Sequence, residues 1–334
     1  MNVLDTSAAL VIAPIAAAVL CAGLIVLLFP VLRRYALARP NARSSHRVPT
    51  PQGGGIAVIA ATMLVAAALA GLMHVAVPLT LFGAMLVVAL VGFADDIRPI
   101  PVLPRLALQA AVVGAVLLAS PAELRIFPAW PIAIERGLLL IAGLWFVNLV
   151  NFMDGLDLMT VVEAVPITGA MMLLGWLGEF PTSATILAAA LCGAMLGYAP
   201  FNKPVARVFL GDVGSLPIGL LLGVLLLQLA WQHHLIAALL LPLYYLMDAT
   251  ITLLRRIARR EPFWAAHRSH FYQRATDHGF SVPRVIGEVF VLNSVLAALA
   301  LTTVLLDSSF AALTALAGGV LAVLVVLRRF SETR

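Results

Sequence analysis

The sequence reads Asn148-Leu149-Val150-Asn151-Phe152-Met153-Asp154-Gly155-Leu156-Asp157 at the junction of two long apolar runs, 137–147 and 158–177. Its Asn and Asp residues recur at every third position, and residues three apart share one face of a helix. We expect a polar stripe that carries two carboxylates at the edge of a membrane, where charge is costly unless it is used. The plainer alternative is a solvated helix end, at which Asn and Asp act as caps.

The composition is that of an integral membrane protein. The 334 residues are 62% hydrophobic and 11% charged, whereas a soluble domain is about half apolar and about a quarter charged. The mean hydropathy is +1.05. At about 20 residues for each span, this length allows ten or eleven transmembrane helices. We therefore predict an all-α, polytopic membrane protein with a single domain over 1–334.

Cysteine use and charge argue against several other classes. Cys21 and Cys192 lie inside apolar runs, without metal-binding spacing and without a disulfide framework. The isoelectric point of 9.8 could suggest binding of nucleic acid. It is better explained by arginines that mark the cytoplasmic side of the membrane and contact anionic lipid. The first apolar segment has no basic region before it and is too long for a cleavable signal peptide.

The hydrophobic pattern predicts about eleven spans, with ten as the lower count. They cover 8–30, 54–73, 77–94, 104–119, 134–150, 158–177, 183–200, 214–231, 235–254, 285–306 and 309–327. The fourth is the least typical, because it is short and carries Arg105 and Gln109.

The connections between these spans alternate in character. One set is polar and rich in Arg, and we expect its loops to build the active site: 31–53, 95–103, 151–157, 201–213 and 255–284. Of the 21 Lys and Arg residues, only Arg125 and Arg136 fall on the other side of the membrane. By the positive-inside rule, the Arg-rich side is cytoplasmic, so the N-terminus lies outside and the C-terminus in the cytoplasm.

The first Arg-rich loop combines basic, hydroxyl and glycine residues. It contains His46-Arg47, then Pro49-Thr50-Pro51, then Gly53-Gly54-Gly55. Glycines beside such side chains allow backbone N–H groups to approach a phosphate. An ordinary turning loop is the alternative.

Two further acidic motifs lie on the same side. Adjacent carboxylates such as Asp95 and Asp96 repel each other, and a divalent metal is a natural partner, since hard cations take oxygen ligands. Phe209-Leu210-Gly211-Asp212-Val213-Gly214-Ser215 places an acid between glycines before a helix, which suits metal or phosphate binding. The alternatives are solvation of a helix end for the first pair and a simple N-cap for Asp212.

The largest Arg-rich loop contains Pro262-Phe263-Trp264-Ala265-Ala266-His267-Arg268-Ser269-His270-Phe271-Tyr272-Gln273-Arg274. Its donors suit phosphate oxygens. Zinc is a poorer fit, because no cysteine is near. An interfacial amphipathic helix is the alternative. Asp248, inside the preceding span, should pair with a cation or a polar group.

These features favour a phosphate-bearing substrate with Mg²⁺. The ion usually binds through one or two carboxylates plus substrate phosphates, and it neutralises charge during displacement at phosphorus. A Walker motif is absent from the sequence, which argues against a nucleoside triphosphatase. A site at the inner leaflet allows one substrate to be a lipid phosphate.

The motifs closely resemble those of the polyprenyl-phosphate N-acetylhexosamine-1-phosphate transferases, glycosyltransferase family 4, which include the phospho-MurNAc-pentapeptide translocase. The matching pieces follow one another from about 41 to 274: Pro-Thr-Pro with Gly53-Gly54-Gly55, Asp95-Asp96, Asn151 to Asp157, Phe209 to Ser215, and His267 with His270. The His-Arg-Ser-His form is similar to the WecA/WbpL-like branch, which starts O-antigen and related glycans, and differs from the triple-histidine form of the translocase.

The resemblance implies a reaction. Undecaprenyl phosphate attacks the sugar-linked phosphate of a UDP-N-acetylhexosamine, UMP leaves, and a polyprenyl-diphosphate sugar remains in the bacterial inner (plasma) membrane. Mg²⁺ is the implied cofactor, with Mn²⁺ as the alternative ion. Membrane lipid is a partner, nucleic acid is not, and a homodimer stays open.

The resemblance also implies roles for residues. Asp212, with Asp95 and Asp96, would hold the metal and carry the catalytic chemistry. The substrate-binding set would be Asn151, Asp154, Asp157, Phe209, Gly211, His46, Arg47, His267, Arg268 and His270. Many relatives read Asp-Gly-x-Asp-Gly, whereas here Leu158 replaces the last glycine. The translocase's first-loop lysine is absent, and Arg43, His46 or Arg47 could take its place.

Two other functions compete with this one. An ion-coupled transporter would use acids near the bilayer midplane, and here only Glu163, Asp248 and Glu288 are available to it. A catalytically inactive membrane scaffold would not need all of the matched acids. The sequence leaves open which UDP-N-acetylhexosamine is used, which glycan is made, and whether the reaction takes one step or two.

Overall fold

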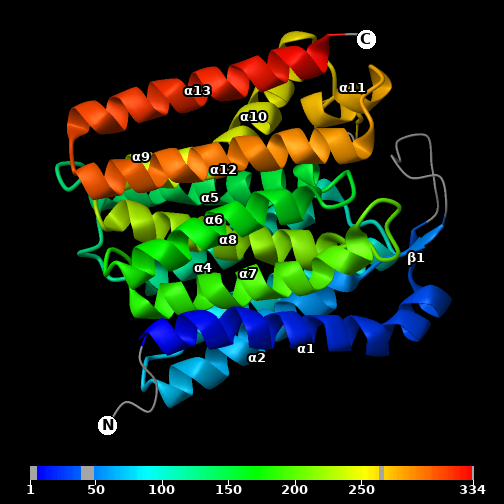
Figure 1. The fold of residues 1–334 in the computed structure, drawn as a ribbon, viewed down its shortest axis with the longest axis horizontal. Helices are drawn as coiled ribbons and strands as arrows, with labels where there is room; N and C mark the ends of the chain where they lie inside the picture. Colours follow the sequence, from blue (N-terminus) through cyan, green and yellow to red (C-terminus); the bar gives the residue numbers. More distant parts are fainter. Residues whose placement is uncertain (1–5, 39–48, 263–266, 333–334) are drawn as a thin grey trace.

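The computed structural model describes residues 6–38, 49–262 and 267–332, and it is a bundle of long helices (Figure 1). The elements in chain order are α1 (Thr6–Tyr35), β1 (Leu37–Ala38), β2 (Thr50–Pro51), α2 (Gly54–Leu72), α3 (Leu79–Ile97), α4 (Val102–Ala119), α5 (Ile132–Met153), α6 (Met159–Trp176), α7 (Thr182–Asn202), α8 (Asp212–Trp231), α9 (Leu235–Leu240), α10 (Leu243–Ala258), α11 (Phe271–Asp277), α12 (Val282–Leu306) and α13 (Ser309–Ser331).

Ten of the described helices are long and apolar enough to cross a membrane: α1 to α8, α12 and α13. The predicted all-α, polytopic class is therefore confirmed. The segment predicted as one span over 235–254 is instead divided into α9 and α10 at Leu241 and Pro242. Proline lacks the backbone N–H and clashes with the preceding turn, so a helix is interrupted there. Beyond this break, α10 runs obliquely to the other helices (Figure 1).

The buried core of the bundle is formed chiefly by α6, α7 and α8. α7 packs against α1, α2 and α6, and α8 packs against α3 and α5. Small residues allow the closest approaches. A Cβ on Gly55 of α2 would lie 2.2 Å from Gly214 Cα of α8, so the two backbones touch where α8 begins.

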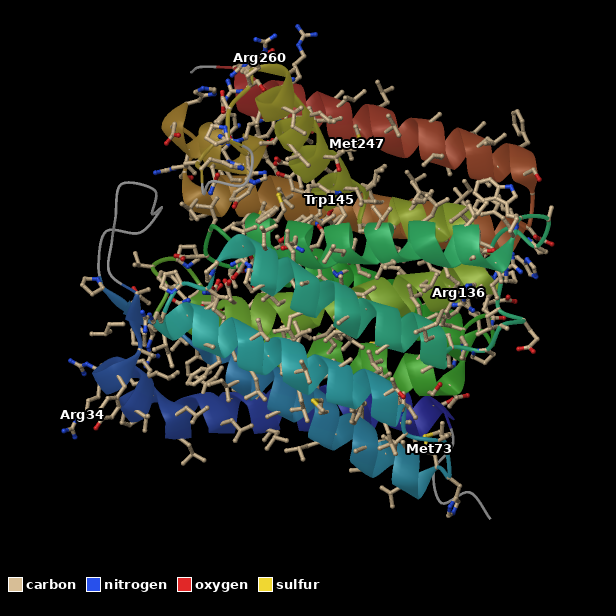
Figure 2. All side chains as sticks on the ribbon, turned by 180° about the vertical axis from the view of Figure 1, so that it is seen from behind. Arg34, Met73, Arg136, Trp145, Met247 and Arg260 are labelled. Atoms are coloured by element: carbon tan, nitrogen blue, oxygen red, sulfur yellow. The ribbon has the colours of Figure 1, made fainter. Side chains whose placement is uncertain are left out.

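One end of the bundle carries the Arg-rich connections. α1 begins at the other end, and α13 finishes at this one, next to α11; β1 lies at the same end (Figure 1). Figure 2 shows Arg34 and Arg260 toward this end and Arg136 at the opposite end. The short ladder that pairs Leu37 with Pro51 and Ala38 with Thr50 also lies here. We call this end the loop end.

Candidate active site

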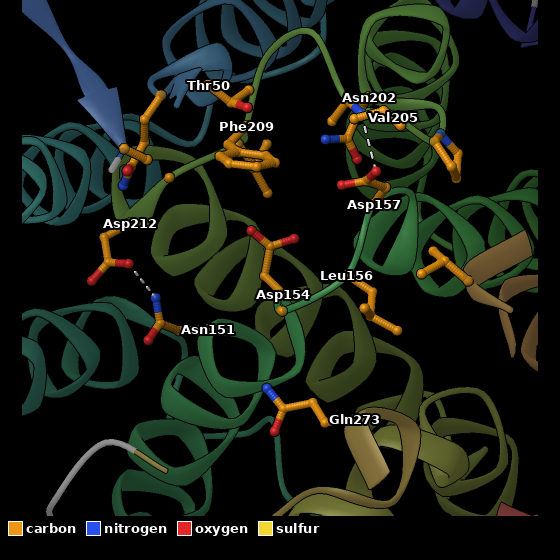
Figure 3. Close-up of a pocket in the computed structure, with 18 of the residues that line it drawn as sticks. Thr50, Asn151, Asp154, Leu156, Asp157, Asn202, Val205, Phe209, Asp212 and Gln273 are labelled. Atoms are coloured by element: carbon orange, nitrogen blue, oxygen red, sulfur yellow. Dashed lines mark hydrogen bonds between the residues drawn. The ribbon is translucent and has the colours of Figure 1, made fainter. Parts of the chain in front are cut away.

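A cavity of about 630 Å³ opens at the loop end (Figure 3). Its walls come from β2, the loop after α5, the α7–α8 connection and the start of α12. It brings together these residues of the expected site: Asn151, Asp154, Asp157, Phe209, Gly211 and Asp212. Segments distant in sequence therefore form one polar chamber.

Asp212 is the first residue of α8, and its carboxylate points into this cavity. The start of α8 is itself held in place by contacts with α3. Across the helix interface, Asp96 of α3 accepts the backbone N–H of Asp212 at 2.9 Å and that of Val213 at 3.1 Å. The Gln52 side-chain amide donates to Asp96 as well. A Cβ on Gly92 would lie 2.3 Å from the Asp212 carbonyl oxygen, so only glycine lets α3 come close enough for this contact.

Asp95 faces a different neighbour. Its carboxylate accepts the backbone N–H of Ile100 at 2.6 Å and pairs with Arg105 of α4 at 2.5 Å. The same guanidinium nitrogen lies 3.8 Å from Asp212 Oδ2. The two adjacent acids thus have separate tasks, since Asp96 caps α8 while Asp95 holds Arg105.

The glycine loop does not present its backbone donors to the cavity. The N–H groups of Gly53 and Gly54 donate to the Phe209 carbonyl, and that of Gly55 donates to the Leu210 carbonyl. These N–H groups were expected to bind phosphate, but they instead hold the segment before Asp212 in position. A buried donor needs a partner, and here the protein supplies one.

The polar stripe expected over 148–157 is only partly formed, because α5 ends at Met153. Asn148 faces another way and donates to Gln109 of α4 at 2.7 Å. Asn151 remains on the site side. Its amide donates to Asp212 Oδ1 at 2.8 Å (Figure 3), which orients the carboxylate of Asp212, and it also donates to Ser215 Oγ at 2.9 Å.

Asp154 lies past the end of α5 in the cavity wall. Removal from water raises the pKa of this carboxyl to about 7, and the nearby carboxylates of Asp96 and Asp157 add to the rise. Thr160 opposes it by donating to Asp154 Oδ1 at 2.5 Å. Asp154 can therefore exchange a proton near neutral pH.

Asp157 lies in the same loop and also lines the cavity. Its carboxylate accepts the backbone N–H of Ala206 at 3.0 Å, which ties the loop to the α7–α8 connection. The next residue, Leu158, has φ of 63°, a conformation that favours glycine. The glycine that the family resemblance leads us to expect here would suit this conformation, and the Leu158 N–H stabilises it by donating to the Asn202 side-chain oxygen at 2.6 Å.

The His-Arg-Ser-His segment packs mainly onto the fold and not into the cavity. His270 contacts Asp248 at 3.3 Å, and Arg268 pairs with Asp277 at 3.0 Å. Burial, with positive charge nearby, lowers the pKa of His267 to about 4, so this ring is neutral at pH 7. None of the three lines the cavity in the described part of the chain, which differs from the expected contact with substrate.

The buried carboxylate of Asp248 explains this arrangement. It accepts the N–H groups of Phe271 at 3.0 Å and Tyr272 at 3.2 Å, at the start of α11, and the Tyr244 hydroxyl at 3.2 Å. Asp248 therefore pairs with polar groups, as expected for an acid inside an apolar segment. Tyr272 in turn donates to the Phe152 carbonyl at 3.0 Å, which holds α11 against the end of α5.

Several site residues were not predicted. Thr50, Gln52, Asn202 and Gln273 line the cavity, and Arg105 lies 3.8 Å from the carboxylate of Asp212. Gln52 and Gln273 stand inside motifs that were already singled out, and Arg105 was visible as a charge within an apolar run. His46, Arg47 and Arg43 lie outside the described residues.

The implied divalent metal can be tested against these donors. Within 6–38, 49–262 and 267–332, no group of three or more His, Cys, Asp or Glu side chains is close enough to hold a metal ion. Asp96 and Asp95 already use both oxygens on protein donors. Asp212 lines the cavity with its Oδ2 turned to Arg105. One such carboxylate fits Mg²⁺, which completes its shell with phosphate oxygens and water.

Comparison with known proteins agrees with these motifs. The family model described as "Glycosyl transferase family 4" matches residues 78–230. A phospho-N-acetylmuramoyl-pentapeptide-transferase of Rickettsia rickettsii (strain Sheila Smith) is 27% identical in a 309-residue alignment that covers 79% of this chain and 83% of that protein. The proteins of the same name from Rickettsia africae (27%) and Rickettsia felis (26%) match over the same shares.

Proposed function

Because the chain belongs to glycosyl transferase family 4, we propose that it transfers an N-acetylhexosamine-1-phosphate from a UDP-sugar to undecaprenyl phosphate, with release of UMP. The observation that carries this proposal is the grouping of Asp212, Asn151, Asp154, Asp157 and Phe209 around one cavity at the loop end. The acids stand at one end of the bundle, where a headgroup can reach them, and this favours a transferase over a transporter.

In this reaction, a lipid phosphate oxygen forms a bond to the sugar-linked phosphorus of the donor. The bond from that phosphorus to the bridging oxygen breaks, and UMP leaves with that oxygen. Mg²⁺ bound at Asp212 would neutralise the negative charge on the two phosphates. Asn151 orients Asp212, and Asp96 fixes the start of α8 beneath it.

The nucleotide of the donor would lie against the part of the cavity wall that Phe209 and the α7–α8 connection form. Phe209 offers a ring for the uracil, while Asp157 holds the α7–α8 connection in place. Asp154, with its pKa of about 7, can donate to or accept from the donor hydroxyls. The positive-inside rule puts the loop end in the cytoplasm, where UDP-sugars are made, in a bacterial inner membrane.

The names of the relatives suggest a second sugar donor that also has to be tested. They are named for the transfer of phospho-N-acetylmuramoyl-pentapeptide, so the cell wall precursor is the alternative to a simple N-acetylhexosamine. The His-Arg-Ser-His form of this chain supports the simple sugar, as in initiators of O-antigen and related glycans.

The decisive assay is UMP release by the purified protein in detergent with undecaprenyl phosphate and Mg²⁺. The donor panel contains UDP-GlcNAc, UDP-GalNAc, UDP-FucNAc, UDP-QuiNAc and UDP-MurNAc-pentapeptide. We expect release that needs both lipid and metal and that is fastest with one of the four simple sugars. Preference for the pentapeptide donor would replace the proposed sugar. An absence of UMP from folded protein with every donor would contradict the transferase.

A further inference from the structure

Arg105 lies between two carboxylates that come from different helices. Its Nη1 is 2.5 Å from Asp95 Oδ2 on α3 and 3.8 Å from Asp212 Oδ2 on α8. The guanidinium is largely buried, with 18% of the side chain exposed. A cation of the protein thus stands against the acid that the proposed function assigns to the metal.

The two cations would seek the same atom. Asn151 donates to Asp212 Oδ1, so Oδ2 is the oxygen turned toward Arg105. A divalent ion binds oxygen atoms directly, and a guanidinium next to that oxygen repels it. Arg105 and the metal therefore compete for Asp212.

The surroundings of Arg105 are energetically unfavourable for its positive charge. Arg105 lies in the first turn of α4, where the helix dipole disfavours a positive charge. Its Nε is buried and has no hydrogen-bond partner, although an unpaired buried donor is unfavourable. Only the carboxylates of Asp95 and Asp212 are seen to compensate, among the described residues.

We propose that Arg105 is a place-holding counter-ion for Asp212, which binding of the divalent metal displaces toward Asp95 and the cavity. The inference rests on the proposed function for the role of the metal. Once displaced, Arg105 stays anchored by Asp95 and offers free N–H donors beside Asp212. Guanidinium N–H groups are strong partners for phosphate oxygens, so Arg105 becomes a positioning residue for the phosphate that follows the metal.

The test is Mn²⁺ affinity, measured by the electron paramagnetic resonance signal of free Mn²⁺ with purified protein and without lipid or UDP-sugar. Arg105→Gln removes the competing cation. Arg98→Gln is the matched control, because it removes the same charge at an exposed position two residues from Asp96. We expect Arg105→Gln to bind Mn²⁺ about fivefold more tightly than the parent, the size of one ion pair at this exposure, and Arg98→Gln to change affinity much less.

A second readout separates positioning from structure. In the transferase assay, Arg105→Gln should raise the KM for undecaprenyl phosphate or lower turnover while its Mn²⁺ affinity rises. Arg105→Lys keeps the positive charge but lacks the guanidinium group, so its Mn²⁺ affinity should lie between those of the parent and Arg105→Gln. This variant replaces Arg105→Gln in the test if Arg105→Gln does not fold. Weaker Mn²⁺ binding in the variants, or a gain no larger than that of Arg98→Gln, would overturn the inference. The Mn²⁺ measurement uses no substrate, so it stands apart from failure of the transferase itself.

Discussion

Asp96 of α3 caps the helix that begins at Asp212, with one carboxylate oxygen 2.9 Å from the Asp212 nitrogen and the other 3.1 Å from the Val213 nitrogen. Asp212 itself sends its carboxylate into the cavity. Two acids of similar appearance in the sequence therefore have opposite orientations in the fold. One holds the start of α8 in place, and the other is presented to the cavity.

This difference predicts different defects for the two amide variants. Asp96→Asn should lower stability by about 1.5–3 kcal/mol, because it replaces a charged cap that accepts two backbone donors. Asp212→Asn should leave the melting temperature in detergent nearly unchanged while abolishing Mg²⁺-dependent turnover. Melting curves and UMP release on the same preparations check both. Retained activity with a normal Mg²⁺ response in Asp212→Asn would remove Asp212 from the metal site.

Asp248 should be required for folding more than for chemistry. It is fully buried and accepts two backbone N–H groups at the start of α11. Asp248→Asn turns one acceptor into a donor, so we expect a loss of about 2–3 kcal/mol and a low yield of folded protein. Asp277→Asn is the control, since Asp277 is exposed at the end of α11, the helix whose start Asp248 caps. Full yield with lost activity in Asp248→Asn would move this acid into the site.

Much of this architecture could be read from the sequence, and the exceptions have physical causes. Apolar runs and Arg-rich loops identify the helices and the loop end, because the bilayer imposes length and charge bias. The break at Pro242 lay inside a run that was apolar enough to pass for one span. The glycines of 53–55 were open to two uses, and only the tertiary contact with Phe209 and Leu210 decides between them.

The site itself was predicted in part. Asn151, Asp154, Asp157, Phe209, Gly211 and Asp212 do line one cavity. The direction of a side chain is not encoded in its motif, so the cap formed by Asp96 could not be told from a second ligand. The orientation of His270 could not be predicted either, because it depends on a contact with Asp248, which lies 22 residues earlier in the chain.

The titration of Asp154 should be visible in stability. Its pKa is raised from 3.8 in the free side chain to about 7 in the fold, so the folded state binds the proton more tightly. The stabilisation is complete below about pH 4 and is lost as the pH rises through about 7. Asp154→Asn cannot titrate and keeps the acceptor for Thr160. In detergent without metal or substrate, the parent should therefore lose more melting temperature between pH 5 and pH 8 than the variant does. Equal losses would contradict the raised pKa.

The contact between Gly155 and Tyr272 should behave as a coupled pair. A Cβ on Gly155 would lie 2.2 Å from the Tyr272 hydroxyl oxygen. Gly155→Ala should cost about 1–3 kcal/mol through overpacking, and Tyr272→Phe about 1 kcal/mol through the lost bond to the Phe152 carbonyl. In the double variant the clash with the hydroxyl is gone, so the combined cost should be well below the sum. Additive costs in a double-mutant cycle would show that the loop relaxes around the added methyl group without pressing on α11.

The orientation in the membrane can be tested with single cysteines, because Cys21 and Cys192 are both buried and should react slowly. Arg259 at the end of α10 is exposed at the loop end, and Glu123 is exposed in the connection between α4 and α5. The positive-inside rule predicts that the loop end is cytoplasmic. A membrane-impermeant maleimide should therefore label Glu123→Cys in intact cells, after passage through the outer membrane, and should label Arg259→Cys only after lysis. The reverse pattern would place the cavity outside the cell, away from the UDP-sugar pool, and would leave the proposed reaction without its donor.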